Sequence, residues 1–142
     1  MEAFPYDAAE LPQLAIPVAQ TLEGFLDLRW IALDDEHAEV RFAVRDALRQ
    51  PLGLLHGGVY SAVAETIASV ATVRAVWPDG FTASGLRNSA QFLRPVTDGS
   101  VRVSARCRHR DDREWLWSHE FHDDRQRLCA IVDVTIAVRR PR

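Results

Sequence analysis

The feature that most constrains this chain is a long run without proline or glycine, from Val59 to Trp77. It is rich in alanine and valine and apolar on nearly every side, which predicts a helix that is buried all round. Such a helix needs other elements wrapped around it, because none of its sides is suited to water. The run follows a loop that holds Pro51 and Gly53 and the triplet His56-Gly57-Gly58, and it ends before Pro78.

The few polar residues of this predicted helix share one narrow face. They follow one another at spacings of four, four and three, and they are Ser61, Glu65, Ser69 and Thr72. A carboxylate buried there without a partner is strongly destabilised or becomes protonated. Glu65, the only acid of the run, therefore either pairs with an arginine such as Arg74 or Arg87 or has a chemical task.

The glycine pair at the start of the helix points to such a task. Gly57 and Gly58 leave backbone N–H groups bare at a helix N-terminus, where the helix dipole favours developing negative charge. Glu65 lies two helical turns further along and can act as a base or a nucleophile. An oxyanion donor that faces a carboxylate is a minimal site for acyl transfer.

Three segments together resemble the hotdog-fold acyl-CoA thioesterases: His56-Gly57-Gly58, Ala64-Glu65-Thr66 and Gln91-Phe92-Leu93-Arg94-Pro95-Val96. The chain looks most like the group that contains the glutamate-dependent 4-hydroxybenzoyl-CoA thioesterase and the phenylacetate-pathway thioesterases. The resemblance covers most of the chain, from Leu22 to Val138. It implies an α+β hotdog fold, an antiparallel sheet wrapped around one long central helix, as a single domain over residues 1–142.

The same resemblance implies a reaction and a set of site residues. An aromatic or medium-chain acyl-CoA would be hydrolysed to a free acid and CoA, with no cofactor and no metal. Glu65 would attack the carbonyl or activate water, the Gly57 N–H would hold the oxyanion, and Ser69 would orient Glu65 or the water. Gln50 would add a hydrogen bond, and His56 would either position the loop or touch the thioester. Further residues expected at the substrate are Gly58, Asn88, Arg94, Arg110 and Arg113.

Two other functions fit part of this pattern. One is a non-catalytic acyl-CoA sensor that has kept the pocket, and the presence of Glu65 argues against it. The other is a hotdog hydratase or dehydratase. Those enzymes resemble one another in using a histidine with an acid on a different motif, so the glycine pair argues against this alternative.

The basic residues are all arginine, which excludes Schiff-base chemistry and a P-loop. Up to Leu93 there are six arginines against twelve acids, and from Arg94 onward eleven against eight. A basic second half in an acidic chain suits a phosphate-bearing ligand better than nucleic acid. We expect Arg94 to hold CoA phosphates, with Arg110 and Arg113 reaching the same nucleotide. The alternative is that these arginines pair with Asp98, Asp111 and Asp112.

Other candidate sites have little support. His119 and His122 lie three apart on a predicted strand and so face opposite sides, which is wrong for a shared metal. Cys107 and Cys129 lie in strand-like stretches without CxxC spacing, as reduced core cysteines of a cytoplasmic protein do. The chain has no run of eighteen apolar residues and no secretory signal, and we expect neither a membrane nor a nucleic-acid partner.

The remaining elements are read from proline, glycine and alternation patterns. The long strand 81–94 is polar for its place, which favours pairing with a second subunit in a homodimer or homotetramer. The resemblance to the hotdog thioesterases implies that this pairing places Glu65 opposite the neighbour's glycines. Trp115 and Trp117 are expected in the core or at an oligomer interface, more than against an adenine base. The sequence predicts a short helix from Pro17 to Gly24, strands at 25–33, 37–45, 81–94, 100–109, 114–122 and 128–138, and a loose tail at 139–142.

Overall fold

The structure, a computed structural model, describes residues 11–142. Within this range one antiparallel sheet holds six strands in the order β1-β2-β4-β5-β6-β3. The elements are α1 (Leu22–Leu26), β1 (Arg29–Leu33), β2 (His37–Ala43), α2 (Gly57–Val76), β3 (Thr82–Phe92), β4 (Ser100–Arg110), β5 (Glu114–His122) and β6 (Leu128–Arg139), with one-turn 3-10 helices at Val18–Gln20, Asp46–Leu48 and Trp77–Asp79.

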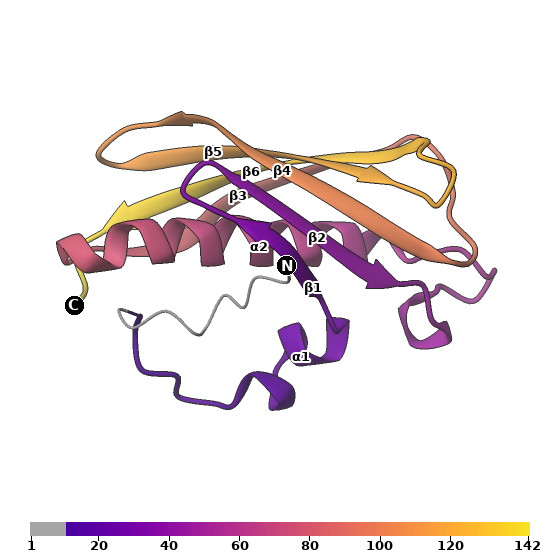
Figure 1. Cartoon of the computed structure of the whole chain (residues 1–142), viewed down its shortest axis with the longest axis horizontal. Coiled ribbons are helices and arrows are strands. Elements are labelled where there is room, and N and C mark those ends of the chain that lie inside the picture. The colour runs from indigo at the N-terminus through magenta and orange to yellow at the C-terminus, as the bar shows by residue number, and fades with distance from the viewer. Residues whose placement is uncertain (1–10) are drawn as a thin grey trace.

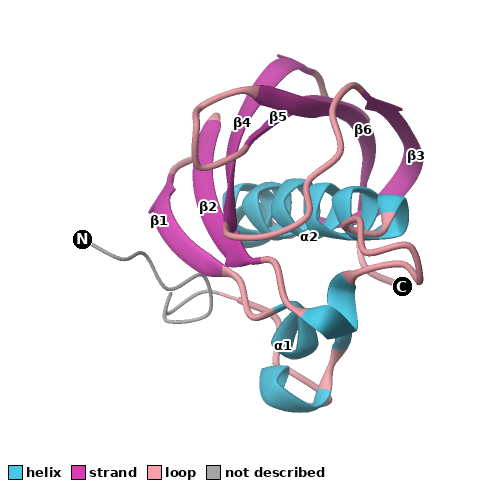
Figure 2. Ribbon diagram, turned by 90° about the vertical axis from the view of Figure 1, so that its right-hand side faces the viewer, coloured by secondary structure: helices cyan, strands magenta, loops and turns pink. Residues whose placement is uncertain are grey.

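The sheet curves around α2, which lies along its concave face (Figures 1 and 2). Alternate residues of the central strands, such as Val103 and Val134, point toward the helix and meet Val63 and Ile67 in one core. α2 has the length and composition of a membrane-spanning helix, but most of it is buried inside this fold. The predicted α+β hotdog architecture, a sheet wrapped around one central helix, is therefore confirmed.

The strand β3 forms one edge of the sheet and β1 forms the other. β3 pairs with β6 on one side only, over eleven residues, and its register shifts at one bulge between Gly85 and Arg87. Its N–H and C=O groups on the other side have no strand partner among residues 11–142, so this edge is open to a further strand.

The predictions for the N-terminal part were wrong in detail. The predicted strand 25–33 begins only at Arg29, because Phe25 and Leu26 belong to α1. Gly24 does not end the helix; it lies inside α1 against the backbone of Val18 and Ala19. Helix α1 ends instead at Asp27, whose left-handed backbone (φ 52°) forms the C-cap.

The aromatic face of β5 packs in the core, which is one of the two locations predicted for Trp115 and Trp117. Trp117 is almost fully buried, and Trp115 is buried beneath the side chain of Arg110, whose Cζ lies 4.9 Å from its ring. Neither ring is open to an adenine. At the C-terminus β6 extends through Arg139, one residue into the predicted tail, and Arg140 stacks 5.0 Å over Phe81.

Candidate active site

The N-terminus of α2 has two glycines that the fold treats differently. His56 is the N-cap, and its Nδ1 accepts a hydrogen bond from the Gly58 N–H at 2.8 Å. No described residue accepts a hydrogen bond from the Gly57 N–H. The loop before it is fixed by backbone bonds from Leu55 to Val96 and from His56 to Leu48. The cap therefore uses the amide of Gly58, which was expected at the substrate, and leaves the amide of Gly57 without a described acceptor. That the Gly57 amide holds an oxyanion stays a prediction.

Glu65 lies eight positions after Gly57 on the same helix and is exposed. The prediction that it is buried was wrong for the single chain. No residue between 11 and 142 forms a hydrogen bond or an ion pair with its carboxylate, so the expected alternative of an arginine partner is not formed. The carboxylate instead lies against the backbone of Gly85 on β3.

The polar face of α2 is shorter than its spacing predicts. Ser61 and Ser69 are half-buried beside Glu65, but Thr72 is fully buried. Its hydroxyl donates to the Ala68 carbonyl at 2.7 Å and accepts from the Trp117 Nε1–H at 3.0 Å. β5 passes over this turn of the helix, so Thr72 belongs to the core although its angular position matches the open face.

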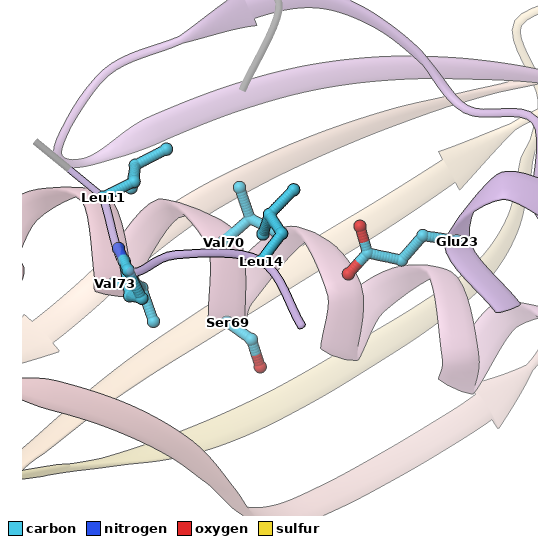
Figure 3. A pocket seen from close by; sticks show the side chains of 7 residues that line it. Leu11, Leu14, Glu23, Ser69, Val70 and Val73 are labelled. Atoms are coloured by element: carbon cyan, nitrogen blue, oxygen red, sulfur yellow. The ribbon is translucent and has the colours of Figure 1, made fainter. Parts of the chain in front are cut away.

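Ser69 borders an apolar cavity of about 200 Å³. Val70 and Val73 of α2 form one wall, and the segment before α1 forms the other through Leu11 and Leu14 (Figure 3). The Glu23 carboxylate of α1 points toward this space in the same view. Glu65, Ser69 and Val73 follow one another at spacings of four on one side of α2, so the cavity begins one helical turn after Glu65.

A larger pocket of about 550 Å³ opens beside Gly57. Gln50, Phe92 and Arg94 line it together with Tyr60. The Gln50 side chain accepts a hydrogen bond from the Leu52 N–H and so braces its own loop. Burial raises the pKa of Tyr60 to about 12, so its hydroxyl stays protonated. Sequence reasoning gave no role to Tyr60 or to the Phe92 ring.

Phe92 packs directly over the glycine that starts the helix. A Cβ at Gly57 would lie 2.9 Å from the Phe92 Cζ, and the Phe92 and Tyr60 rings are 5.6 Å apart. Glycine at this position therefore lets the ring approach the free amide closely. The alternation of β3 gives the only sequence signal for this contact, because it places Phe92 on the helix-facing side.

Asn88 faces α2, but its amide is used by the fold. Its Nδ2 donates to the Ser61 carbonyl at 2.9 Å and ties β3 to the helix. Other polar residues of the strand, such as Ser84 and Arg87, are exposed as well. The Oδ1 of Asn88 has no described donor and so can still accept a hydrogen bond from a ligand. A contact between Asn88 and substrate therefore stays a prediction.

The three arginines predicted to bind one nucleotide do not lie together in one chain. Arg94 lines the pocket at Gly57, and its backbone N–H donates to Cys129 at the start of β6. The carbonyl of Arg113 accepts from Val138 near the end of β6. These two points are about 30 Å apart at ~3.3 Å per residue of strand, so Arg94 and Arg113 of one chain lie at opposite ends of β6. That these arginines reach one nucleotide in the assembled oligomer stays a prediction.

None of the alternative ion pairs predicted for these arginines is formed in the described part of the chain. Arg110 lies 3.4 Å from Glu36 and stacks on Trp115, rather than pairing with an aspartate of its own turn. Asp111 accepts the backbone N–H groups of Arg113 and Glu114, which hold the pKa of its carboxyl below the usual range. The Arg94 side chain forms no ion pair with a described residue, so the predicted pair with Asp98 is not formed.

The histidines do not form a metal site in the described part of the chain, where no group of three potential ligands is found. His119 is buried in the core, and its Nδ1 bonds the Val132 carbonyl at 2.9 Å. Burial lowers the pKa of His119 from 6.5 to about 4, so it is neutral at physiological pH. Its Nε2 has no hydrogen-bond partner.

Comparison with known proteins assigns the site to a family. The profile of the thioesterase superfamily matches residues 52–130, which include the α2 glycines, Glu65 and Arg94. The chain belongs to this superfamily. A 1,4-dihydroxy-2-naphthoyl-CoA hydrolase of Escherichia coli is 34% identical over 115 residues, covering 81% of this chain and 84% of that protein.

Two further proteins agree with this assignment. The proofreading thioesterase EntH of Cronobacter turicensis is 33% identical over 121 residues, covering 83% and 85% of the two chains. The crystal structure of a variant thioesterase from Pseudomonas aeruginosa superposes with a TM-score of 0.81 at 29% identity, over 86% of this chain and 88% of that one. The resemblance read from the motifs is therefore confirmed, and the protein is a thioester hydrolase whose family supports acyl-CoA substrates.

Proposed function

We propose that this protein hydrolyses an acyl-CoA with an aromatic or medium-chain acyl group, with Glu65 as the nucleophile or general base. The observation that carries this proposal is an exposed carboxylate without any described partner on the same helix as a free N-terminal amide. The amide of Gly57 would bind the oxyanion that forms at the thioester carbonyl, and Glu65 would attack that carbonyl or activate water.

Within one chain the two groups are too far apart to act on one carbonyl. Eight residues of helix separate Gly57 from Glu65 by about 12 Å, at ~1.5 Å per residue. Along β3, Glu65 lies at the level of Gly85 and Gly57 at the level of Phe92. Antiparallel pairing of β3 with the β3 of a second copy, about a two-fold axis near Asn88, would bring the Gly57 of one copy to the Glu65 of the other. The open edge of β3 supports this arrangement.

The acyl group would lie in the apolar cavity that begins at Ser69. Its volume of about 200 Å³ suits one aromatic ring or a short alkyl chain, since an apolar cavity of roughly 150 Å³ accepts benzene. The name of the Escherichia coli relative, a hydrolase of a naphthoyl-CoA, supports an aromatic acyl group. Ser69 would orient Glu65 or the attacking water at the mouth of this cavity. CoA itself belongs to the substrate, and we expect the reaction to need neither cofactor nor metal in the cytoplasm.

The test is release of free thiol from a panel of acyl-CoAs that contains benzoyl, phenylacetyl, hexanoyl and acetyl thioesters. We expect turnover of the aromatic and medium-chain members, with acetyl-CoA slowest because it leaves the apolar cavity empty. Tight binding of several acyl-CoAs without thiol release would support the sensor instead. The Glu65→Gln variant serves as the control for hydrolysis that does not depend on the site.

Recognition of the CoA nucleotide is assigned to Arg94, the one predicted phosphate ligand that lines the pocket at Gly57. A planar guanidinium can bind two phosphate oxygens at once. If it holds phosphate equally in the ground and transition states, Arg94→Ala should raise KM with little change in kcat. The increase should disappear with a truncated pantetheine thioester. An equal increase in KM for both substrates would mean that Arg94 has a structural role. The matched control is Arg125→Ala, in the β5–β6 turn.

The assembly needs its own measurement. Light scattering at micromolar concentration should give a homodimer or homotetramer of the 16.0 kDa chain. An active monomer would contradict the composite site, because one chain alone does not bring Gly57 and Glu65 together.

A further inference from the structure

A bulge in β3 lies at the level of Glu65. The ladder between β3 and β6 shifts register at Leu86, which is an extra residue on the β3 side. In a regular strand, residues three apart face opposite sides of the sheet. The extra residue changes that alternation, so Gly85 and Asn88 both lie on the face that α2 covers, opposite the core residues Ile136 and Val134 of β6.

Gly85 is the point where the carboxylate of Glu65 meets this strand. A Cβ added at Gly85 would overlap the Glu65 Oε1 and lie 3.1 Å from its Cδ. The backbone of Gly85 does not have positive φ, so any residue could adopt its conformation. Space for the carboxylate, rather than backbone geometry, is therefore the physical reason for a glycine at this position.

We propose that Gly85 is a positioning residue for Glu65. The absence of a side chain lets the carboxylate rest on the β3 backbone, at the sheet edge where the second copy would present its thioester. Since no described residue holds Glu65 by a hydrogen bond, the shape of this contact fixes where its oxygens lie. The inference rests on the proposed function, because the reaction requires the carboxylate at a defined place.

The Gly85→Ala variant tests this directly. The atom that the new methyl group would overlap is the end of a flexible side chain, so Glu65 can rotate into solvent without any backbone movement. We expect an unchanged melting temperature and oligomeric state, an unchanged KM, and a kcat lower by about 10- to 100-fold, since displacing a reacting group by ~1 Å has effects of this order. Ser84→Ala, at the neighbouring exposed position of the same strand, should keep the kcat of the original protein.

A double-mutant cycle separates positioning from general damage. Glu65→Asp shortens the side chain by one methylene and so removes the overlap. Gly85→Ala should therefore reduce kcat much less in the Glu65→Asp background than in the original protein. An equal reduction in both backgrounds would overturn the proposal, as would a Gly85→Ala variant with kcat within about 2-fold of the original.

A crystal structure separates this inference from the proposed function. If the original protein hydrolyses no member of the acyl-CoA panel, the proposed function fails. The role of Gly85 is then decided by a crystal structure of Gly85→Ala, in which a displaced Glu65 carboxylate supports the proposal and an unmoved one overturns it.

Discussion

On the side that is buried in the core, α2 presents Val63, Ala64 and Ile67 without any solvent exposure, whereas Glu65, which lies against the edge strand β3, is exposed. The buried side meets its neighbours through tight apolar contacts and the hydrogen bond between Thr72 and Trp117. The open side has polar groups whose partners are missing from the single chain. One helix therefore separates two tasks: its buried face determines stability, and its open face holds the groups proposed for catalysis.

The largest expected effect comes from the open face. Glu65→Gln should lower kcat by about 10²- to 10⁴-fold, because it removes the nucleophile or base. Its melting temperature should change little, since the carboxylate has no partner in the described chain to lose. Steady-state kinetics and thermal melts on one preparation measure both. Glu120→Gln, an exposed glutamate on β5, is the control, and a Glu65→Gln protein with more than about a tenth of the original turnover would mean that Glu65 is not catalytic.

The buried side should respond to acid through His119. The folded state holds the pKa of His119 at about 4, against 6.5 in the unfolded chain, because burial disfavours the charged ring. Below pH 6.5 the unfolded state binds the extra proton, so this contribution to stability is complete above 6.5 and is lost as the pH falls toward 4. The loss approaches ~1.4 kcal/mol per pH unit in that window.

Urea unfolding between pH 4 and pH 7.5 measures this dependence. His119→Gln keeps a donor for the Val132 carbonyl but cannot titrate, so its stability should fall less steeply over the same range. Identical slopes for the two proteins would show that His119 does not cause the acid sensitivity.

A smaller loss of stability is expected at the end of the helix that β5 covers. Thr72→Val keeps the volume of the side chain but leaves the buried Trp117 Nε1–H without its acceptor, which costs about 1–3 kcal/mol. Denaturant unfolding measures the change, and Thr66→Val, at a half-buried position of the same helix, should cost less. Catalytic turnover of the folded Thr72→Val protein should be unaffected. A large loss of kcat in a fully folded Thr72→Val protein would mean that Thr72 contributes to the proposed active site on the open face.

The smallest effect is expected at the N-cap. His56→Ala removes the acceptor for the Gly58 N–H and should destabilise the protein by about 0.5–2 kcal/mol, while His56→Asn should restore most of that loss. The Asn variant also decides between the two roles predicted for His56. Full turnover would mean that the residue only positions the loop, and low turnover at full stability would mean that it contacts the thioester.

Much of the fold follows from local sequence patterns. The central helix was predicted to within two residues at its start and one at its end, and β5 was predicted with its observed bounds. The helix is signalled by its long apolar run without proline or glycine and β5 by its alternation of apolar and polar residues, and both have clear proline or turn boundaries. The segment around Phe25 was misassigned because a short apolar stretch is compatible with a helix or a strand, and Asp27 ended the helix through a left-handed backbone that its residue type only weakly signals.

The candidate site divides in the same way. The amide of Gly57, the carboxylate of Glu65 and the pocket residue Arg94 were predicted from sequence motifs. Their surroundings were not: Arg113 lies at the far end of β6 from Arg94, and the contact between Gly85 and Glu65 has no signature along the chain.

The sequence by itself determined that a helix apolar on nearly every side must be enclosed, and that one polar face of it would hold a lone acid behind a glycine pair. Those properties are encoded by residues a few positions apart. Only the tertiary structure decided that Thr72 is covered while Glu65 is open, and that a bulge at Leu86 turns a glycine toward the carboxylate. The physical reason is that strand register and helix placement are set by contacts between residues distant in the chain, whose partners no local pattern identifies.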